Sequence, residues 1–338
     1  MKEDRNTYPS MKNIKLSIII PIYNAVQYIQ RTLESIAEQT LREIEVICVL
    51  DCPTDGTDQI VLSFAQKDSR FKVLANEVGL HIGGSRNKGL SVAQGEYIGF
   101  CDHDDWCDPQ MFETLYVAAK AQNADTVLSH VCTMTPNDQK QVFPIPTTDF
   151  KTYSAVQNII LATPSHPGCV SYGNDNSVWT HLYKKSFLDT YHIHFVDTKK
   201  ISPEDRLFNI ECYLHNPKVV GVDKTLYYWQ LNSMNTSYSY AYRSPAKIIG
   251  YIRYLYQLLK QANQLEDYRQ AFSIGYVRKL YTSYCSEVRV TNWISTFFKI
   301  RKQLQEAQIE EIRSYVRHSH FLFQLPPTKA LFYLFCLK

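Results

Sequence analysis

Short apolar segments alternate with amphipathic segments through the first 130 residues, and this alternation restricts the fold more than any other feature. Residues 16–20 form a largely β-branched, apolar run that ends at Pro21, which is typical of a strand buried on both faces. The same reasoning predicts strands at 45–50, 71–74, 97–101 and 126–130, and helices at 29–40, 60–65 and 111–122. Such close alternation indicates an α/β fold with a doubly wound, mostly parallel sheet.

The pattern changes near residue 240, where we place a domain boundary. Apolar residues then recur at helical spacing, at Ile248, Ile249, Ile252, Leu255, Tyr256 and Leu259. We predict a flexible leader at 1–14, an α/β domain in two halves at 15–125 and 126–239, and a C-terminal helical appendage at 240–338. Within the second half, the proline-containing segment 132–175 is predicted to form loops, and short strands are predicted at 219–222 and 226–229.

Three carboxylates lie within four residues directly after the predicted strand at 97–101, in the segment Asp102-His103-Asp104-Asp105. Open α/β sheets bind their ligands at the carboxyl ends of strands. Carboxylates so close together repel unless a cation lies among them, and Mg2+ or Mn2+ takes oxygen ligands that substrate phosphates often share. The alternative is an Asp-rich turn, in which Asp104 or Asp105 caps the helix that follows Pro109.

Tyr23 and Asp51 follow the first two predicted strands and are therefore expected at the same edge of the sheet. The Asp51 carboxylate could accept a hydrogen bond from a nucleobase or a ribose hydroxyl, and Tyr23 could stack on the base. The alternative for Asp51 is an Asx-turn or a helix cap before Thr54.

Two more charged segments have both a chemical and a structural interpretation. Arg86, at a predicted helix start, could donate paired hydrogen bonds to a phosphate, or could be an ordinary surface arginine. Glu204 and Asp205 precede an amphipathic segment, where one of them could act as a general base. Alternatively, both could simply stabilise the N-terminus of that helix.

Several common functional classes are excluded by missing motifs. There is neither a Gly-x-Gly-x-x-Gly after the first strand nor a Gly-Lys-Ser/Thr, so dinucleotide and P-loop sites are not expected. Nine cysteines without Cys-x2-Cys spacing indicate free thiols in a reducing compartment. The polar start is unlike a signal peptide, and no run of about 18 apolar residues occurs. We therefore expect a cytoplasmic protein.

Taken together and in order, these segments resemble the family 2 glycosyltransferases. The resemblance covers roughly residues 14–237. It rests on Ile-Ile-Ile-Pro-Ile-Tyr-Asn (18–24), the turn after Asp51, Ser-Arg-Asn-Lys-Gly-Leu (85–90), Asp-His-Asp-Asp (102–105), Glu-Asp-Arg-Leu-Phe-Asn (204–209) and Leu-Tyr-Tyr-Trp (226–229). It implies a GT-A fold and an inverting transfer of a sugar from a nucleotide-diphosphate donor, with 15–125 binding the donor and 126–239 the acceptor.

The resemblance also implies roles for individual residues, matched position by position. It puts Pro21, Tyr23 and Asp51 in the uracil pocket, Arg86 near the nucleotide, Asp102 near the ribose and the metal, Asp104 on a Mg2+ or Mn2+ ion, and Asp205 as the general base preceded by Glu204. An α-linked donor would then give a β-glycoside.

The chain departs from the family pattern in two segments. Leu50 stands where the family usually has an aspartate, and Cys52-Pro53 replaces Gly-Ser, so the base and ribose contacts there are open. Thr180-His181 after Trp179 replaces Asn-Lys, which leaves the role of that segment open. A nucleotide-sugar-binding protein without turnover is therefore an alternative.

The charge distribution suggests a partner for the C-terminal region. Residues 240–338 hold 15 Lys and Arg against 6 Asp and Glu, interleaved with aromatic residues. Such a segment suits binding to an anionic membrane surface, at the inner face of the cytoplasmic membrane. A lipid-linked or lipopolysaccharide-type glycan acceptor would fit an enzyme bound there. The alternatives are helices that only pack into a core, or a membrane-associated interaction protein; no nucleic-acid-binding motif accompanies the charge.

Overall fold

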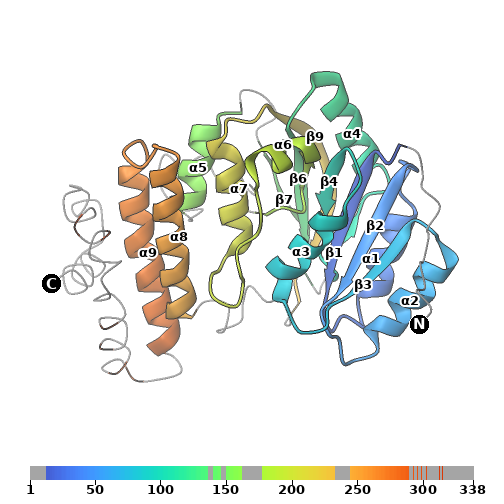
Figure 1. Ribbon diagram of the computed structural model, residues 1–338, viewed down its shortest axis with the longest axis horizontal. Helices are drawn as coiled ribbons and strands as arrows, with labels where there is room; N and C mark the ends of the chain where they lie inside the picture. The colour runs from blue at the N-terminus through green and yellow to red at the C-terminus, as the bar shows by residue number, and fades with distance from the viewer. Residues whose placement is uncertain are drawn as a thin grey trace, which may run out of the picture.

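The protein is described here by a computed structural model that covers residues 13–135, 140–145, 150–161, 177–232 and 244–288, with isolated residues at 292, 295, 298, 302, 312 and 314. Within these residues, one nine-stranded sheet has the order β3-β2-β1-β4-β8-β6-β9-β5, with β7 paired to β6 (Figure 1). Helices cover both faces of the sheet. The α/β prediction with a doubly wound sheet is confirmed.

The first four strands of the sheet order are parallel. They are β3 (Phe71–Ala75), β2 (Ile44–Leu50), β1 (Leu16–Ile22) and β4 (Tyr97–Phe100). The helices that connect and follow them are α1 (Ile29–Ala37), α2 (Thr57–Lys67), α3 (His81–Val92) and α4 (Met111–Gln122). The strands and helices predicted for this half are therefore present, and parallel strands bring their carboxyl ends to one edge.

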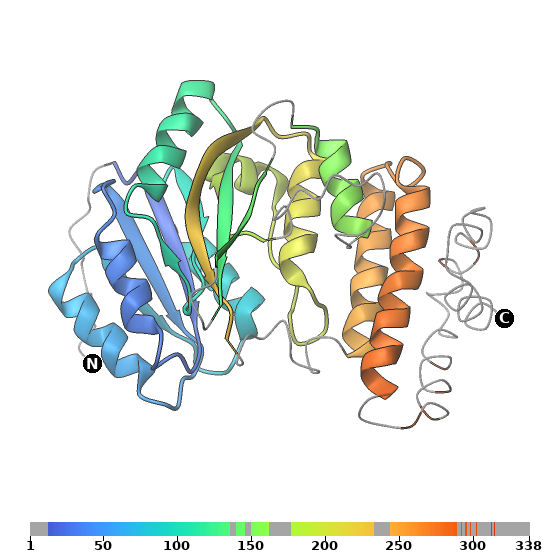
Figure 2. The ribbon, with the colours of Figure 1, turned by 180° about the vertical axis from the view of Figure 1, so that it is seen from behind.

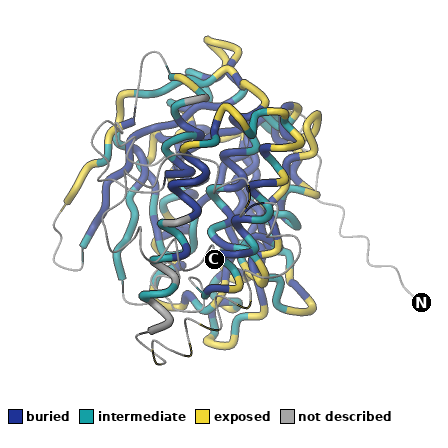
Figure 3. The backbone as a smooth tube through the Cα atoms, turned by 90° about the vertical axis from the view of Figure 1, so that its left-hand side faces the viewer, coloured by how far each residue is buried: buried dark blue, intermediate teal, exposed yellow. Residues whose placement is uncertain are grey.

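Successive side chains of β1 face opposite sides of the sheet, as the two-residue period of a strand requires. Ile18 and Ile20 pack in one core cluster with residues of α1, α2 and α4. Ile19 packs in a second cluster, with residues next to α3 and from the later helices. Figure 3 shows the consequence, with buried segments in the interior and exposed segments at the periphery. Because β1 is apolar on both faces, helices pack on both sides of the sheet.

The second half of the sheet is mixed. It contains β6 (Thr126–Met134), β7 (Lys140–Phe143), β8 (His181–Lys184) and β9 (Val219–Gln230), together with the two-residue β5 (Trp106–Cys107). β8 runs antiparallel to both β4 and β6, whereas β9 is parallel to β6. β8 is followed directly by α6 (Lys185–Tyr191).

The loop prediction for 132–175 is wrong at three places. β6 extends to Met134, β7 pairs with it, and α5 spans Thr152–Leu161. Two short strands expected at 219–222 and 226–229 form the single strand β9, whose pairing with β6 shifts register near His130. Long-range pairing overrides the local polar residues there.

Three helices of the described residues lie toward the end of the molecule opposite α1 and α2 (Figures 1 and 2). They are α7 (Glu204–Leu214), α8 (Pro245–Gln261) and α9 (Arg269–Val288). Apolar residues of α5, α7, α8 and α9 form one core cluster. None of the helices within the described ranges combines the length and apolarity needed to cross a bilayer. The predicted leader, apart from residues 13–14, and most of the predicted C-terminal region after residue 288 lie outside the described residues.

Candidate active site

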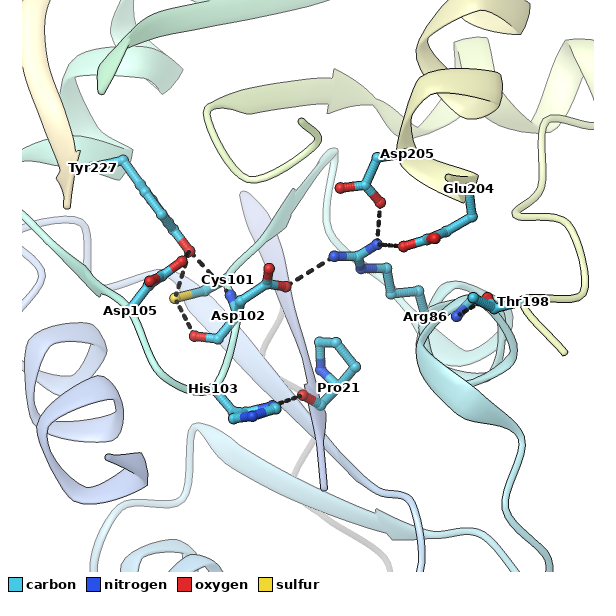
Figure 4. A network of polar contacts seen from close by, with 11 residues as sticks. Pro21, Arg86, Cys101, Asp102, His103, Asp105, Thr198, Glu204, Asp205 and Tyr227 are labelled. Atoms are coloured by element: carbon cyan, nitrogen blue, oxygen red, sulfur yellow. Dashed lines mark hydrogen bonds and ion pairs between the residues drawn. The ribbon is translucent and has the colours of Figure 1, made fainter. Parts of the chain in front are cut away.

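Strands and helices from both halves of the chain bring the predicted site residues to one edge of the sheet. Pro21 lies in β1, Asp51 directly follows β2, and Asp102 lies just beyond β4. Glu204 and Asp205 begin α7 and face this edge from the other side, as Figure 4 shows. Sequence positions up to 184 residues apart therefore converge, as the resemblance implied.

Arg86 connects the two sides of the site. Its guanidinium is fully buried; Nη2 lies 2.8 Å from Oδ1 of Asp102, and Nη1 lies 3.1 Å from Oε1 of Glu204. The same Nη1 also donates to Oδ1 of Asp205 (Figure 4). Burial alone would lower the pKa of Arg86, but Asp205, Asp102 and Glu204 outweigh it and raise the pKa. Arg86 is thus no surface arginine, and its outer nitrogens hold carboxylates.

Asp205 is a carboxylate that is partly accessible to solvent. Its side chain is 17% exposed, whereas that of Glu204 is 4% exposed. Burial raises the pKa of the Asp205 carboxyl well above its usual range, and the Arg86 guanidinium opposes that shift. The carboxylate is thus reachable and has a high affinity for a proton. Glu204 lies behind it, against Arg86.

Helix α3, which carries Arg86, packs closely against the segment that leads to α7. The backbone N–H of Gly83 donates to Oγ1 of Thr198 over 2.9 Å, in the segment that leads to α7. A Cβ atom at Gly83 would come within 2.5 Å of both Thr198 Oγ1 and the carbonyl oxygen of Val196. Only glycine allows this approach, and it sets α3, which carries Arg86, beside the start of α7.

Asp105 has a structural role. It is fully buried; Oδ2 accepts a 2.7 Å hydrogen bond from the Tyr227 hydroxyl, and Oδ1 accepts a 2.8 Å bond from the backbone N–H of Gln230. Burial raises the pKa of Asp105 well above its usual range, and the neighbouring Asp104 and Asp102 add to the shift. The hydroxyl of Tyr227 also accepts from the backbone N–H of Asp102, over 3.1 Å. The acidic segment is therefore anchored to β9 and not to α4.

Asp104 and Asp102 are the carboxylates left for a cation. Oδ2 of Asp104 accepts from the side-chain amide of Asn232 over 3.0 Å. Burial raises the pKa of Asp104, His103 opposes the shift and Asp102 reinforces it. Asp102 pairs with Arg86 through Oδ1, and Oδ2 takes no part in that ion pair. A nearby divalent cation would stabilise both carboxylates in the ionised form.

The donor set fits Mg2+ or Mn2+ only if the substrate supplies further ligands. No group of three or more His, Cys, Asp or Glu side chains in the described part of the chain is arranged to hold a metal ion. Mg2+ is commonly held by one or two carboxylates plus substrate phosphates and water, and two aspartates meet that requirement. The residues present therefore fit a metal that arrives with a nucleotide diphosphate.

Asp51 and Tyr23 differ in how far they are already engaged. Oδ1 of Asp51 accepts hydrogen bonds from the Asn76 side chain at 2.7 Å and from the backbone N–H of Leu80 at 2.6 Å. Oδ2 accepts from the N–H of His81 at 2.8 Å. Asp51 thus caps the start of α3. The alternative drawn from the sequence was an Asx-turn or a helix cap before Thr54, at a different place in the chain. Tyr23 is 54% exposed, so its ring is open to a ligand.

The Trp179 segment forms part of the core. The Trp179 ring stacks on Tyr227 with centroids 4.3 Å apart. His181 is fully buried between the hydroxyls of Thr180 and Tyr213, each 3.0 Å from a ring nitrogen. Burial lowers the pKa of His181 to about 3, so it is neutral at physiological pH. Trp179 therefore supports the acidic segment through Tyr227, whose hydroxyl hydrogen-bonds Asp105 and the backbone of Asp102.

Sequence reasoning missed the residues that anchor the acidic segment. Tyr227, Gln230 and Asn232 all lie at the end of β9 or just after it. The signal was the Leu-Tyr-Tyr-Trp motif at 226–229, which carried the resemblance but received no role. Arg31 was also missed; its guanidinium lies 3.8 Å over the Trp106 ring and donates to the carbonyl oxygen of Asp104 over 3.2 Å.

Comparison with known proteins finds similarity to glycosyltransferases. Residues 17–161 match the model of the family described as Glycosyl transferase family 2. The chain is 29% identical over 224 residues to the uncharacterized glycosyltransferase EpsJ of Bacillus subtilis, covering 64% of this chain and 61% of that protein. It is 25% identical over 297 residues to the poly(ribitol-phosphate) beta-N-acetylglucosaminyltransferase TarS of Staphylococcus aureus, covering 86% of this chain and 48% of that protein. In both cases the alignment spans less than two thirds of the relative.

The fold is also that of a solved glycosyltransferase. Residues 1–349 of S. aureus TarS in complex with UDP-GlcNAc superpose with a TM-score of 0.66, at 23% identity, over 96% of this chain and 88% of that chain. At this identity the likeness establishes the fold and no more. The sheet and the helices α8 and α9 are thus both included in the shared architecture.

Proposed function

We propose that this chain is a family 2 glycosyltransferase with a GT-A fold, which transfers a hexose or N-acetylhexosamine from a nucleotide-diphosphate sugar to a hydroxyl of a glycan or glycolipid. The match of residues 17–161 to that family's model and the fold shared with TarS support this proposal. One observation carries the proposal. Arg86 joins Asp102, beyond β4, to Asp205, at the start of α7. The nucleotide and the acceptor would meet between these carboxylates. TarS was solved with UDP-GlcNAc, which makes a UDP-sugar the first donor to test.

The donor nucleotide would bind along the carboxyl ends of β1, β2 and β4. Tyr23 is exposed and would stack on the base beside Pro21, while Oδ2 of Asp51 would accept a further hydrogen bond from the base. Oδ2 of Asp102 takes no part in the ion pair with Arg86 and would accept a hydrogen bond from a ribose hydroxyl. Arg86 would serve the nucleotide indirectly, by holding Asp102 in place.

Asp104, with Asp102, would hold a Mg2+ or Mn2+ ion together with the donor diphosphate. Supporting this is the burial of Asp104, whose raised pKa reflects the cost of keeping an isolated charge there. When bound, the ion would stabilise the negative charge that develops on the departing nucleoside diphosphate.

Asp205 would act as the general base. Its carboxylate would take the proton of the acceptor hydroxyl while that oxygen attacks the anomeric carbon opposite the leaving group. A single displacement of this kind inverts the configuration, so an α-linked donor would give a β-glycoside. Arg86 would fix the orientation of Asp205, and Glu204 would complete the ion-pair network behind it. Orientation of this kind matters because small misplacements of a catalytic group cost large factors in rate.

The acceptor would belong to a bacterial surface polysaccharide. Both sequence relatives described above are bacterial glycosyltransferases, and TarS acts on poly(ribitol-phosphate). The basic and aromatic residues of 240–338 would favour work at the inner face of the cytoplasmic membrane on a lipid-linked acceptor. A cytoplasmic location remains part of this proposal.

A panel of nucleotide sugars tests the proposal. We expect release of the nucleoside diphosphate from at least one UDP-sugar in the presence of Mg2+ or Mn2+, and loss of that release with EDTA. Release should accelerate when a glycan acceptor is added. Tight binding of a nucleotide sugar without release, across metals and acceptors, would instead support the nucleotide-sugar-binding alternative.

A further inference from the structure

Two cations act on one buried tyrosine where α7, α8 and α9 meet, and a third lies one helical turn away. Nζ of Lys279, on α9, lies 4.2 Å from the centroid of the Tyr251 ring, on α8. Arg206, on α7, is close enough to act electrostatically on both Tyr251 and Lys279. Lys247 lies one helical turn before Tyr251 on the same face of α8 and interacts electrostatically with Glu204. We call Arg206, Lys247 and Lys279 the basic cluster.

The polar groups of the basic cluster are not used by the protein itself. Within the described residues, Arg206, Lys247 and Lys279 form neither a hydrogen bond nor an ion pair, in contrast to Arg86. The hydroxyl of Tyr251 is buried and has no hydrogen-bond partner in the described part of the chain. An unpaired buried hydroxyl destabilises a folded protein, so a bound group that pairs with it would be favourable.

The electrostatics of the basic cluster favour an anion. Burial lowers the pKa of Lys279 well below its usual range, and Arg206 lowers it further. Burial also lowers the pKa of Lys247. All three cations remain partly exposed, so a ligand can reach them. A bound anion would relieve the repulsion between Arg206 and Lys279 and accept a hydrogen bond from Tyr251.

The position of the basic cluster connects it with the acceptor. Arg206 directly follows Asp205 in the first turn of α7, and Lys247 is electrostatically coupled to Glu204. We infer that the basic cluster binds a phosphate group carried by the acceptor, next to the hydroxyl that Asp205 would deprotonate; this inference rests on the proposed function. Arginine forms paired hydrogen bonds with phosphate, and lysine adds a point charge. The phosphate would come from the glycan chain or from a lipid headgroup.

Phosphate binding is measured on the full chain with saturating UDP, which keeps the probe out of the donor site. The soluble probe is glycerol 3-phosphate, with glycerol as the uncharged comparison, and affinities are read by titration calorimetry. We expect Arg206→Gln and Lys279→Gln each to weaken glycerol 3-phosphate binding by about tenfold, since charge-assisted hydrogen bonds are lost. Tyr251→Phe keeps the ring and should weaken binding by about threefold.

Lys260→Gln is the matched control, because Lys260 is an exposed cation on the same helix, 13 residues after Lys247. Its affinity for the probe should equal that of the wild type. A second arm measures sedimentation with phosphatidylglycerol vesicles. If the cluster variants lose vesicle binding but retain glycerol 3-phosphate binding, the phosphate source is a lipid headgroup.

Unchanged binding of both probes in Arg206→Gln, Lys279→Gln and Tyr251→Phe would overturn the inference. UDP affinity is measured in every variant and should stay constant, which also shows that the variants are folded. Failure of the proposed function would appear differently, as absence of UDP binding and of nucleoside diphosphate release in the wild type.

Discussion

At the scale of single residues, Arg86 is the side chain on which the site depends. Its buried guanidinium neutralises carboxylates from β4 and α7. Removing one partner of a buried ion pair typically costs about 3–5 kcal/mol, because the other charges stay buried without compensation. We therefore expect Arg86 to contribute to stability and, under the proposed function, to catalysis, because it joins the two sides of the candidate site.

Arg86→Lys should preserve the charge and lose the function. A lysine ammonium cannot present the planar fork that reaches Asp102 and Asp205 at once, so we expect a loss of about 2–3 kcal/mol in the free energy of unfolding. Sugar transfer should fall at least about 100-fold, because Asp205 loses its orientation. Urea unfolding and nucleoside diphosphate release measure the two effects.

Arg70→Lys is the control for this substitution. Arg70 is also paired with an aspartate, Asp68, but at the partly exposed edge near β3, away from the site. Transfer by Arg70→Lys should match that of the wild type. An Arg86→Lys enzyme as active as the wild type would show that Arg86 does not position the base.

Single residues also show which contacts of the candidate site could not be predicted from the sequence. The acidic segment was identified as a site or a cap, and the structure separates its members: Asp105 hydrogen-bonds Tyr227, which is 122 residues away. No local pattern contains that pairing, because it depends on β5 lying against β9. By contrast, the grouping of Asp102 with Asp205 was predictable from the ordered motifs of the family.

At the scale of elements, helix α3 is held against β1 by the absence of a side chain. A Cβ atom at Gly89 would lie 2.5 Å from Cγ2 of Ile19, which is fully buried in β1. The β-branched isoleucine cannot move aside without disturbing the core around it. Since α3 carries Arg86, this contact sets the distance of the guanidinium from the sheet.

Gly89→Ala should therefore destabilise the protein even though alanine favours helices. We expect a loss of about 1–3 kcal/mol in the free energy of unfolding, the usual range for overpacking a core. Gly79→Ala is the matched control, since a Cβ atom there meets nothing within 4 Å, and its effect should stay below about 0.5 kcal/mol. Equal stabilities for the two variants, measured by urea unfolding, would contradict the packing argument.

Elements with strong internal signals were predictable, and those defined by distant partners were not. β1 and β2 consist of buried residues throughout, so their apolar runs sufficed. β7 is largely exposed and exists because it pairs with β6. The polar and charged residues inside β9, such as Asp223 and Lys224, suggested a break that the pairing with β6 bridges as a register shift.

At the scale of the whole molecule, α7 joins the edge of the sheet that holds the candidate site to helices α8 and α9. Its first turn carries Glu204 and Asp205, and its later residues share a core with α5, α8 and α9. Glu211 lies in this helix and hydrogen-bonds Tyr254 of α8. Burial raises the pKa of Glu211 to about 7, with Tyr254 opposing the shift. The junction between α7 and α8 thus contains a carboxyl group that prefers to be protonated.

The pH dependence of stability should report on Glu211. Between its ordinary pKa of 4.5 and its folded value of about 7, the native state keeps a proton that the unfolded state has lost. The free energy of unfolding therefore falls as the pH rises through that window. Glu211→Gln should flatten this dependence and raise stability at pH 8 by about 1–2 kcal/mol.

Urea unfolding at pH 5, 6, 7 and 8 makes this measurement. Glu77→Gln, an exposed loop carboxyl replaced in the same way, is the control and should leave the pH profile of the wild type unchanged. A Glu211→Gln profile that runs parallel to the wild type would mean that the α7–α8 junction does not bind this proton.

The most direct test of the whole account compares sugar transfer and UDP affinity in Asp205→Asn and the wild type. The amide keeps the shape of the side chain but cannot take a proton, so we expect transfer to fall by about 10²–10⁴-fold while UDP affinity stays within about threefold. Asp189→Asn, at an exposed ion pair with Lys185 on α6, should behave as the wild type. Transfer at the wild-type rate by Asp205→Asn would contradict the assignment of the base and, with it, the proposed mechanism.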